Sequence, residues 1–368
     1  MTECTEGKDP TQAMKNAELT SSHEPVAQVG LDDGYAFTKV ALPDGRLIAI
    51  PSRARIGPAG VTWMREEHQR IFEYDTGGTR YSVGAVDGEP THFEGYPTSG
   101  LNRVTVQHAL QQAGLAGRSI HMVSGLPVAA FYRNDGQRRQ QAIQRKRESL
   151  QMTVEPVSTS GQARKPGLKA CVAFHEVIPE ALAAWYDHVI VMTEDGVTLD
   201  ADRVSAPLAI VDIGGRTTDY VVVQDQGVVH SSSGSLDRGM LTVKIQVANQ
   251  IQAHFDVDRL GEQRLAHAVE THSLRLHGRE HDVSAIVCAA KRELVERLYA
   301  ETRRQLGLGA ELDGVLFVGG GSAALAADIA DWFPNQRIAD HPVFANARGM
   351  LKYLQFVCDD TASLGNGF

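Results

Sequence analysis

The amino-acid sequence predicts an α/β fold made of two similar domains, because one strand–turn–strand pattern occurs twice. Residues 29–42 read VGLDDGYAFTKVAL, and residues 209–223 read AIVDIGGRTTDYVVV. Each segment is an apolar run, an Asp-x-Gly turn with small and hydroxyl residues, and a second apolar run. A third glycine turn, VLFVGGGSAAL, follows at residues 315–325. Glycine turns of this kind can hold phosphate groups, so the pattern predicts a nucleotide-binding cleft between the two domains.

Length and composition agree with this organisation and exclude several other classes. The 368 residues exceed a typical single domain, and 42% of them are hydrophobic, which is ample for ordinary cores. The net charge of −9 gives no electrostatic reason for direct nucleic-acid binding. The cysteines are scattered and form no CxxC pair, so neither a disulfide framework nor a zinc site is predicted. They are Cys4, Cys171, Cys288 and Cys358.

The sequence shows neither a membrane-spanning segment nor an export signal. No apolar run approaches the roughly 20 residues that a membrane span requires, and the first residues lack the apolar stretch of a signal peptide. We therefore expect a cytoplasmic protein with no membrane partner. Residues 1–25 are polar and are predicted to form a disordered tail.

Domain I is predicted to span residues 26–200. It begins with strands at 26–31, 38–42 and 46–50 around the first loop, and residues 61–83 suggest a small β-rich insertion. Next come a helix at 105–115 and a strand at 119–124. A basic helix at 134–150, a strand at 170–177 and a helix from Pro179 onward follow. The charges of the basic helix indicate a solvated face rather than a binding patch.

Domain II is predicted to span residues 201–343 and to repeat the opening of domain I. Its strands are expected at 208–211, 220–223, 227–232 and 315–318, and its helices at 241–255, 283–306 and 323–332. The final segment, residues 344–368, opens with a helix that we expect to pack back on domain I.

The two loops carry residues suited to phosphate and to a divalent cation. Glycines allow backbone N–H groups to approach a phosphate closely, and Mg²⁺ prefers oxygen ligands and keeps several waters. Asp32 and Asp212 each end a strand, so they can hold the water shell of Mg²⁺ from opposite sides of the cleft, and Lys39 can reach the phosphates as a point charge. We expect nucleotide contacts from Asp33, Gly34, Tyr35, Thr38 and Lys39 in the first loop, and from Gly214, Gly215, Arg216, Thr217 and Thr218 in the second.

A single Asp-x-Gly is a common hairpin turn, but the pair with equal offsets is a strong signal. The triple glycine, Gly319, Gly320 and Gly321, is expected to contact the adenosine because it follows two phosphate loops. Hydrolysis also needs a group that orients or deprotonates water. Glu180, in VIPEALAA between the two loops, is the best candidate, although a carboxylate favoured by a helix N-terminus remains an equal interpretation.

These residues resemble the ATPase superfamily of actin, the heat-shock chaperones and the sugar kinases. That superfamily has two phosphate loops, an adenosine loop and two connecting segments, which correspond here to residues 32–39, 212–219, 319–325, 180–184 and 346–351. Within it the sequence is most similar to plasmid-segregation actins of the ParM/StbA type. The resemblance is carried by QHALQQAGL, MVSGLPVAAFYRNDGQ and VIPEALAAWY, and it covers residues 26 to about 353.

The resemblance implies an actin-like fold of two RNase H-like domains flanking the cleft. It implies a protein that hydrolyses ATP, with GTP left open, in the presence of Mg²⁺ and polymerises into polar filaments. Such filaments move plasmid copies through a small DNA-binding adaptor of the ParR/StbB type, bound at a centromere-like site, so contact with DNA is indirect. It assigns the hydrolytic water to Glu180, Mg²⁺ to Asp32 and Asp212 through waters, the adenosine to the triple glycine and a base-side contact to Lys291.

Two residues depart from the family pattern, and other functions stay open. Tyr35 stands where many actins have a serine, and Arg216 stands at a position that is often small; Arg216 would either contact a phosphate or, as we favour, point to solvent. A heat-shock chaperone is disfavoured because little chain follows the second connecting segment. A small-molecule kinase would need a catalytic aspartate that we do not find, and a cell-shape or division actin is disfavoured by the lack of an amphipathic membrane helix.

Overall fold

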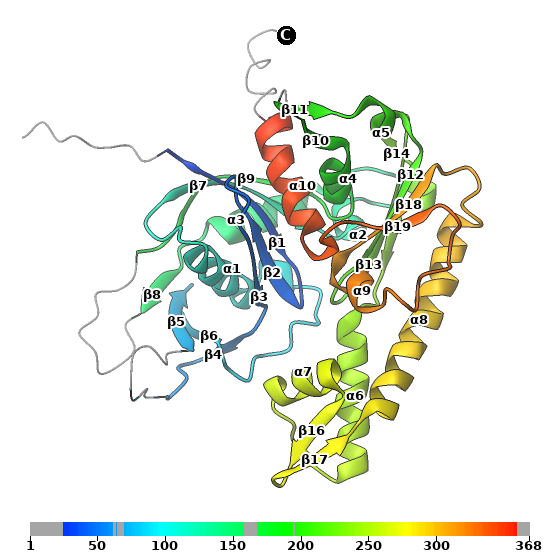
Figure 1. Ribbon diagram of the computed structural model, residues 1–368. Coiled ribbons are helices and arrows are strands. Elements are labelled where there is room, and N and C mark those ends of the chain that lie inside the picture. Colours follow the sequence, from blue (N-terminus) through cyan, green and yellow to red (C-terminus); the bar gives the residue numbers. More distant parts are fainter. Residues whose placement is uncertain (1–24, 62–63, 65–69, 158–167, 194–195, 359–368) are drawn as a thin grey trace, which may run out of the picture.

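The computed structural model describes residues 25–61, 64, 70–157, 168–193 and 196–358. The predicted disordered tail therefore lies outside the described residues, apart from Pro25. Figure 1 shows two α/β bodies side by side, each built on a central sheet, with a lobe of helices and a hairpin below the second sheet. This arrangement confirms the predicted α/β fold.

The sheet of the first domain surrounds the first loop. Its order is β3-β2-β1-β7-β9, in which β1 (Ala27–Asp33) pairs antiparallel with β2 (Phe37–Ala41) and parallel with β7 (Ser119–Leu126). β3 (Leu47–Pro51) and β9 (Cys171–Pro179) lie at its edges. The parallel strands β1, β7 and β9 all point their carboxyl ends toward the same edge of the sheet, where the first loop lies.

The sheet of the second domain repeats this topology. Its order is β14-β13-β12-β18-β19, and β15 (Gly234–Leu236) also pairs with β13. β12 (Leu208–Ile213) runs antiparallel to β13 (Thr218–Gln224) and parallel to β18 (Gly314–Val318), as β1 does to β2 and β7. The edge strands are β14 (Gly227–Val228) and β19 (Gln336–Ile338).

The register of the two sheets confirms that the two loops are equivalent. Asp32 pairs with Lys39 across β1 and β2, and Asp212 pairs with Asp219 across β12 and β13. Lys39 lies seven residues after Asp32, and Asp219 lies seven residues after Asp212, so the same two positions face each other in both domains.

Helices and a second, smaller sheet complete the first domain. α1 (Gly100–Gln112) begins earlier than predicted because the Ser99 side chain caps it by accepting a hydrogen bond from the Asn102 N–H. The β-rich insertion is a sheet of order β4-β6-β5-β8. The other elements are β4 (Ala54–Ile56), β5 (Ile71–Thr76), β6 (Thr79–Gly84), η3 (Tyr96–Thr98), α2 (Val128–Phe131), α3 (Gln140–Gln151), β8 (Glu155–Val157), α4 (Leu182–Val189), β10 (Ile190–Thr193), β11 (Gly196–Leu199) and α5 (Ala201–Ser205).

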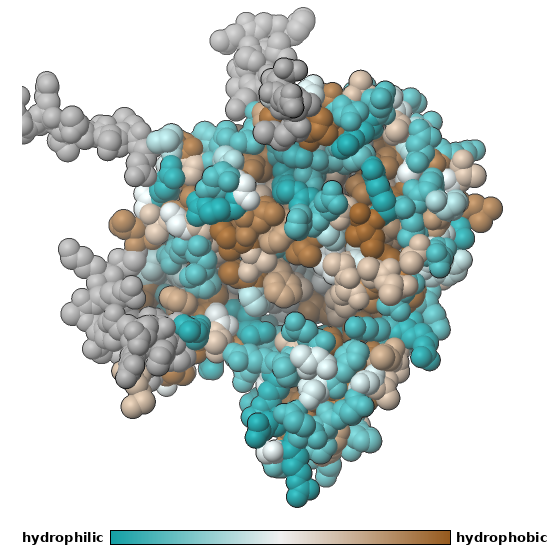
Figure 2. Space-filling view, in the orientation of Figure 1, coloured by the Kyte–Doolittle hydropathy of each residue, from teal (hydrophilic) through white to brown (hydrophobic). Residues whose placement is uncertain are grey.

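The second domain adds long helices and a hairpin. α6 (Met240–Phe255) and α8 (Ser284–Leu306) pack together, and α7 (Glu262–Thr271) lies against α6 beside the hairpin of β16 (Ser273–Leu276) and β17 (Arg279–Asp282). Figure 2 shows this lobe to be mostly hydrophilic on the visible face, with apolar residues nearer the middle of the molecule. The short segments η4 (His230–Ser232), α9 (Gly319–Ala324) and η5 (Pro342–Phe344) connect the elements. The helix predicted at 323–332 thus starts and ends earlier, since the triple glycine itself forms its first turn.

The last helix, α10 (Ala345–Tyr353), packs against β1 and α4 of the first domain and continues as η6 (Leu354–Cys358). Two glycines make this close packing possible. A Cβ on Gly30 would lie 2.0 Å from the Ala347 carbonyl oxygen, and a Cβ on Gly349 would lie 1.7 Å from the Ala183 carbonyl oxygen. The chain therefore returns to the first domain after completing the second.

One apolar cluster joins the two domains at the base of the cleft. Ala181 and Trp185, from the start of α4, pack with Ile210 and Val221 of the second sheet and with Ala345 of α10. Each domain also has a core of its own. The cluster holds the carboxyl ends of the two sheets near each other, which is where the two loops lie.

Candidate functional site

The two glycine loops touch each other across the cleft. A Cβ on Gly215 would lie 2.7 Å from the Ala36 Cβ and 2.9 Å from the Ala36 nitrogen. Real Cβ atoms do not approach backbone so closely, so only glycine at 215 allows this contact. The two loops that the sequence predicted from a repeated motif thus lie in contact with each other.

The N-terminus of α6 supports the second loop. The Met240 N–H donates to the Gly214 carbonyl at 3.1 Å, and the Leu241 N–H donates to the Gly215 carbonyl at 2.8 Å. A Cβ on Gly239 would lie 2.5 Å from the Gly215 carbonyl oxygen. Sequence reasoning missed Gly239, although a glycine directly before a predicted helix was a signal of close approach.

Lys39 lies among carboxylates in the site. Its Nζ donates to Asp32 Oδ2 at 2.7 Å, and both side chains are nearly buried. Burial lowers the pKa of Lys39, but the charges of Asp32, Asp212 and Glu180 outweigh it, so that the pKa is raised and the ammonium stays charged. Gly34 faces this pair, because a Cβ there would lie 3.3 Å from Asp32 Oδ1.

Asp212 lies beside the triple glycine. Its Oδ2 accepts a hydrogen bond of 2.6 Å from Asn346 Nδ2, and a Cβ on Gly319 would lie 2.2 Å from its Oδ1. Gly321 is equally close to Ile213, whereas a Cβ on Gly320 would face open space. Burial, followed by the charges of Asp32 and Asp219, raises the pKa of Asp212 to about 7.

Glu180 and Asp219 complete an acidic group. Burial raises the pKa of Glu180 well above its ordinary value, with further contributions from Asp219, Asp32 and Asp212. Its side chain lies over Gly125, where a Cβ would be 2.8 Å from Glu180 Cγ. The charges of Asp32 and Asp212 both act on the Glu180 carboxylate, so this carboxylate lies near both loops.

Asp219 is a site residue to which the sequence analysis gave no role. Its carboxylate accepts hydrogen bonds from the Val128 N–H at 2.7 Å, from the Thr217 hydroxyl at 2.8 Å and from the Ser235 hydroxyl. Burial raises its pKa despite these donors. The signal in the sequence that could have identified Asp219 is its offset: it follows Asp212 by seven residues, as Lys39 follows Asp32.

Three side chains predicted to contact the nucleotide lie on the opposite faces of their strands. Asp33 accepts from Lys146 and, at 2.8 Å, from Asn102; Thr38 shares a 3.1 Å hydrogen bond with Ser52. The Thr218 hydroxyl donates to the Arg238 carbonyl at 2.9 Å. Neighbouring residues of a strand point to opposite faces, so when Asp32 and Asp219 face the cleft, Asp33, Thr38 and Thr218 cannot.

The ion pair of Asp33 also corrects the interpretation of the basic helix. Lys146, on α3, is fully buried, so it does not belong to a solvated face. Burial raises the pKa of Asp33 even though Lys146 and Asn102 lower it. A buried charge needs a partner, and Lys146 supplies it to the end of β1.

Arg216 does not point to solvent, contrary to the interpretation favoured by its sequence. Its guanidinium carbon lies 5.3 Å from the centroid of the Tyr35 ring, and Nη1 donates to the Tyr35 hydroxyl at 3.3 Å. Nη2 donates to Asp237 Oδ2 at 3.0 Å. Arg216 therefore joins the second loop to the first across the cleft.

A second contact between the domains lies at the N-terminus of α7. Asp87, which follows β6 of the first domain, accepts from the Glu262 N–H at 3.2 Å. The Glu262 carboxylate in turn pairs with Lys244 of α6 and lies 3.8 Å from Arg53 of the first domain. An acidic side chain at a helix N-terminus is favourable, so this contact holds the two domains together away from the loops.

Lys291 lies half-buried on α8, whose inward face packs in the core of the second domain.

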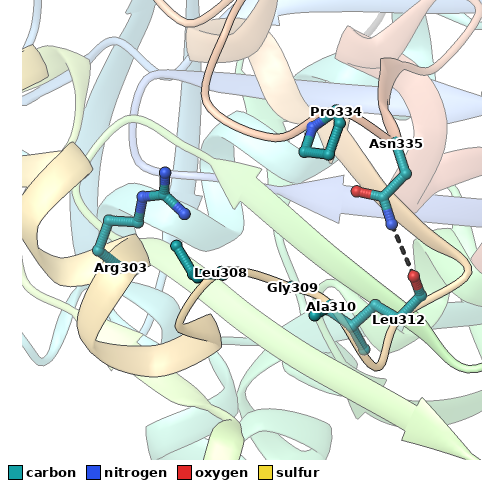
Figure 3. A pocket seen from close by; sticks show the side chains of 7 residues that line it. All are labelled: Arg303, Leu308, Gly309, Ala310, Leu312, Pro334 and Asn335. Carbon is teal, nitrogen blue, oxygen red and sulfur yellow. Dashed lines mark hydrogen bonds between the residues drawn. The ribbon is translucent and has the colours of Figure 1, made fainter.

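A separate hollow of about 470 Å³ lies at the opposite edge of the second sheet from the loops. Arg303, Leu308 and Asn335 are among the residues that line it, with Arg303 and Asn335 on opposite sides (Figure 3). It contains no residue of the predicted site.

The donor set of the site fits a divalent cation held through waters. Burial, with the charges of Asp32 and Asp219 added to it, raises the pKa of Asp212, and Lys39 lowers it, so a further cation near these carboxylates would relieve their repulsion. Within the described residues, no group of three or more His, Cys, Asp or Glu side chains is placed to hold a metal directly. Mg²⁺ commonly keeps several waters and binds through one or two carboxylates, which agrees with this arrangement.

Two family models match separate parts of the chain. Residues 28–189 match the N-terminal domain of the plasmid segregation protein ParM, also named StbA, and residues 210–331 match the C-terminal domain of the archaeal actin homologue MreB-like. No curated protein matches the chain in sequence. Of the helices that the structure describes, none has the length and apolar character needed to span a membrane.

Solved structures with the same fold cover nearly the whole chain. The archaeal actin homolog Ta0583 is 20% identical with a TM-score of 0.66, covering 90% of this chain and 99% of its own, and it has also been solved with ADP. A 15-stranded ParM filament from Clostridium botulinum is 19% identical with a TM-score of 0.69, over 90% and 99%. Bacillus thuringiensis ParM with ATP is 15% identical with a TM-score of 0.61, over 92% and 100%. These structures show that the fold is actin-like.

Proposed function

We propose that this chain, which has an actin-like fold and matches the ParM/StbA N-terminal model over residues 28–189, is a filament-forming ATPase that segregates plasmid DNA. The observation that carries the proposal is that the two equivalent loops lie in contact, which only a glycine at position 215 allows. Beside this contact, Lys39 pairs with the carboxylate of Asp32. Such a site has the parts that phosphoryl transfer requires, namely backbone N–H groups, a cation and acidic residues.

We propose that the loops hold the phosphates of ATP, or of GTP, between the two domains. Backbone N–H groups of Gly34, Gly214 and Gly215 would contact the phosphates, and Lys39 would exchange part of its contact with Asp32 for a phosphate oxygen. Gly320, where a Cβ would meet open space, leaves room for the adenosine beside the triple glycine. Lys291 remains the proposed base-side contact.

Glu180 is the proposed group that orients the attacking water. Its pKa is raised by burial and by Asp219, so it accepts a proton more readily than an exposed carboxylate. Mg²⁺, when bound through waters to Asp32 and Asp212, would neutralise charge on the phosphates. Glu180 then holds the water in line with the terminal phosphorus and receives its proton as the water oxygen bonds to that phosphorus and the bond to the departing nucleoside diphosphate breaks.

Filament formation and DNA segregation rest on the family and on its solved relatives. A relative of the same fold forms a 15-stranded filament, and the matching N-terminal model is that of a plasmid segregation protein. The net charge of −9 favours an indirect contact with DNA. We propose that a small DNA-binding adaptor of the ParR/StbB type links the filament to a centromere-like plasmid site.

Right-angle light scattering of the purified protein, with phosphate release followed in parallel, tests this function. After Mg²⁺ and ATP are added, we expect scattering to rise and then to decay as ATP is consumed; GTP is compared in the same way. Phosphate release without scattering at any protein concentration would contradict filament formation and would favour a non-filament ATPase or small-molecule kinase of the same fold.

A further inference from the structure

The segment after Glu180 is a strained three-residue turn. The Leu182 N–H donates to the Glu180 carbonyl at 2.7 Å, and Ala181 between them has φ 61° and ψ −45°. This is the γ-turn with a positive φ, which is rare and strained for a residue with a side chain. Ala181 is fully buried, so the surrounding structure must hold the turn in place.

Asn346, in the first turn of α10, provides that support and extends it to the second domain. Its Oδ1 accepts a hydrogen bond of 3.1 Å from the Ala181 N–H, and its Nδ2 donates to Asp212 Oδ2 at 2.6 Å. The side chain is nearly buried. One amide group therefore contacts both the turn that follows Glu180 and the carboxylate of Asp212, the last residue but one of β12.

The position of Asn346 is fixed by packing. Ala345 and Ala347, on either side of it, are buried, and Gly349 brings α10 into contact with the Ala183 carbonyl one turn later. α10 packs mainly against β1 and α4 of the first domain, whereas Asp212 belongs to the second sheet. The hydrogen bond from Asn346 to Asp212 therefore joins the two domains.

We infer that Asn346 is a positioning residue that makes the orientation of Glu180 depend on the position of Asp212. The inference rests on the proposed hydrolysis of a nucleotide at this site. An amide suits the role because it offers an acceptor to one partner and a donor to the other. Alanine would leave the buried Ala181 N–H and the Asp212 carboxylate each short of a partner, and aspartate would keep the acceptor and lose the donor.

The test compares steady-state hydrolysis of Mg-ATP with nucleotide affinity in the full-length protein. For Asn346→Ala we expect kcat to fall on the order of 100-fold, as for misplaced catalytic groups, while the affinity for ATP changes less than about threefold. Asn346→Asp keeps the acceptor for the Ala181 N–H, and its kcat should also fall. If thermal unfolding shows that the alanine variant does not fold, the aspartate variant is used for the test instead. Asn335→Ala is the matched control, because it removes a 2.6 Å amide–carbonyl hydrogen bond to Leu312 at the far edge of the second domain (Figure 3).

A double variant separates a positioning role from a merely structural one. If Asn346 acts through Glu180, then Asn346→Ala should slow a Glu180→Gln protein by much less than it slows the wild type. An equal slowing in both backgrounds, a loss of affinity without a loss of kcat, or an equal effect of Asn335→Ala would overturn the inference. A Glu180→Gln protein that hydrolyses ATP normally would instead refute the proposed role of Glu180, whatever Asn346 does.

Discussion

Replacing Asp212 by asparagine should stabilise the nucleotide-free protein at alkaline pH. Asn346, Asp32 and Asp219 surround Asp212, and its pKa is raised from 3.8 to about 7, mainly by burial. One pKa unit corresponds to about 1.4 kcal/mol, so keeping Asp212 ionised in the folded state costs about 4 kcal/mol well above neutral pH. Asparagine has the same shape and carries no charge.

The sign follows from proton linkage. Because the folded pKa is raised, the folded protein binds the Asp212 proton more tightly than the unfolded chain does. This contribution to stability is fully present below pH about 3.8 and is lost as the pH rises through about 7. The stability of the Asp212→Asn variant relative to the wild type should therefore increase by about 2–3 kcal/mol between roughly pH 5 and pH 8.

Urea unfolding of the nucleotide-free protein, in the presence of a chelator, measures this difference at both pH values. Asp44→Asn is the control, since Asp44 is exposed, pairs with Arg46 and has a lowered pKa. A relative stability of Asp212→Asn that does not change with pH, or that falls toward alkaline pH, would refute the reasoning. Mg-ATP should stabilise the wild type more than the variant, because the variant lacks one of the proposed metal carboxylates.

Three further predictions concern contacts around the loops. Gly215→Ala should force the second loop away from Ala36 and weaken ATP binding at least tenfold, as seen by titration; unchanged affinity would show that the loops need not touch. Arg216→Ala should speed dissociation of a fluorescent ATP analogue severalfold by removing the stacked contact across the cleft, and an unaltered rate would argue that this contact does not hold the cleft closed. Lys146→Met should cost about 3–5 kcal/mol at neutral pH by leaving Asp33 unpaired. Adding Asp33→Asn to Lys146→Met should restore most of the lost stability. Chemical denaturation of the single and the double variant measures this, and a double variant no more stable than the single one would contradict the prediction.

The repeated motif predicted the two loops from their equal offsets. The equal offsets from Asp32 to Lys39 and from Asp212 to Asp219 in the sequence became equal cross-strand pairs in the two sheets. The pattern worked because strand, turn and strand are close in sequence, so that local geometry fixes which residues face each other. The buried position of Asp219 beside the other carboxylates was nevertheless missed, since two of its three donors, the Val128 N–H and the Ser235 hydroxyl, come from other segments.

Side-chain direction and long-range contacts were beyond the sequence patterns. Asp33 and Thr38 were grouped with the loop although the pleat turns them to the other face. Lys146 belongs to a strongly charged helix, and only the fold reveals that it is buried against Asp33. Asn346 contacts Asp212 and Ala181 from far along the chain, and no local periodicity carries that information.

The measurement that tests the central claim most directly is the fate of filaments formed by Glu180→Gln. Sedimentation after addition of Mg-ATP, followed over time beside phosphate release, compares this variant with the wild type. The account predicts that wild-type polymer disappears as ATP is consumed, whereas the variant binds ATP, releases phosphate at least tenfold more slowly and keeps its polymer. Normal phosphate release by the variant, or polymer that forms and persists equally in both proteins, would contradict a filament governed by hydrolysis at Glu180.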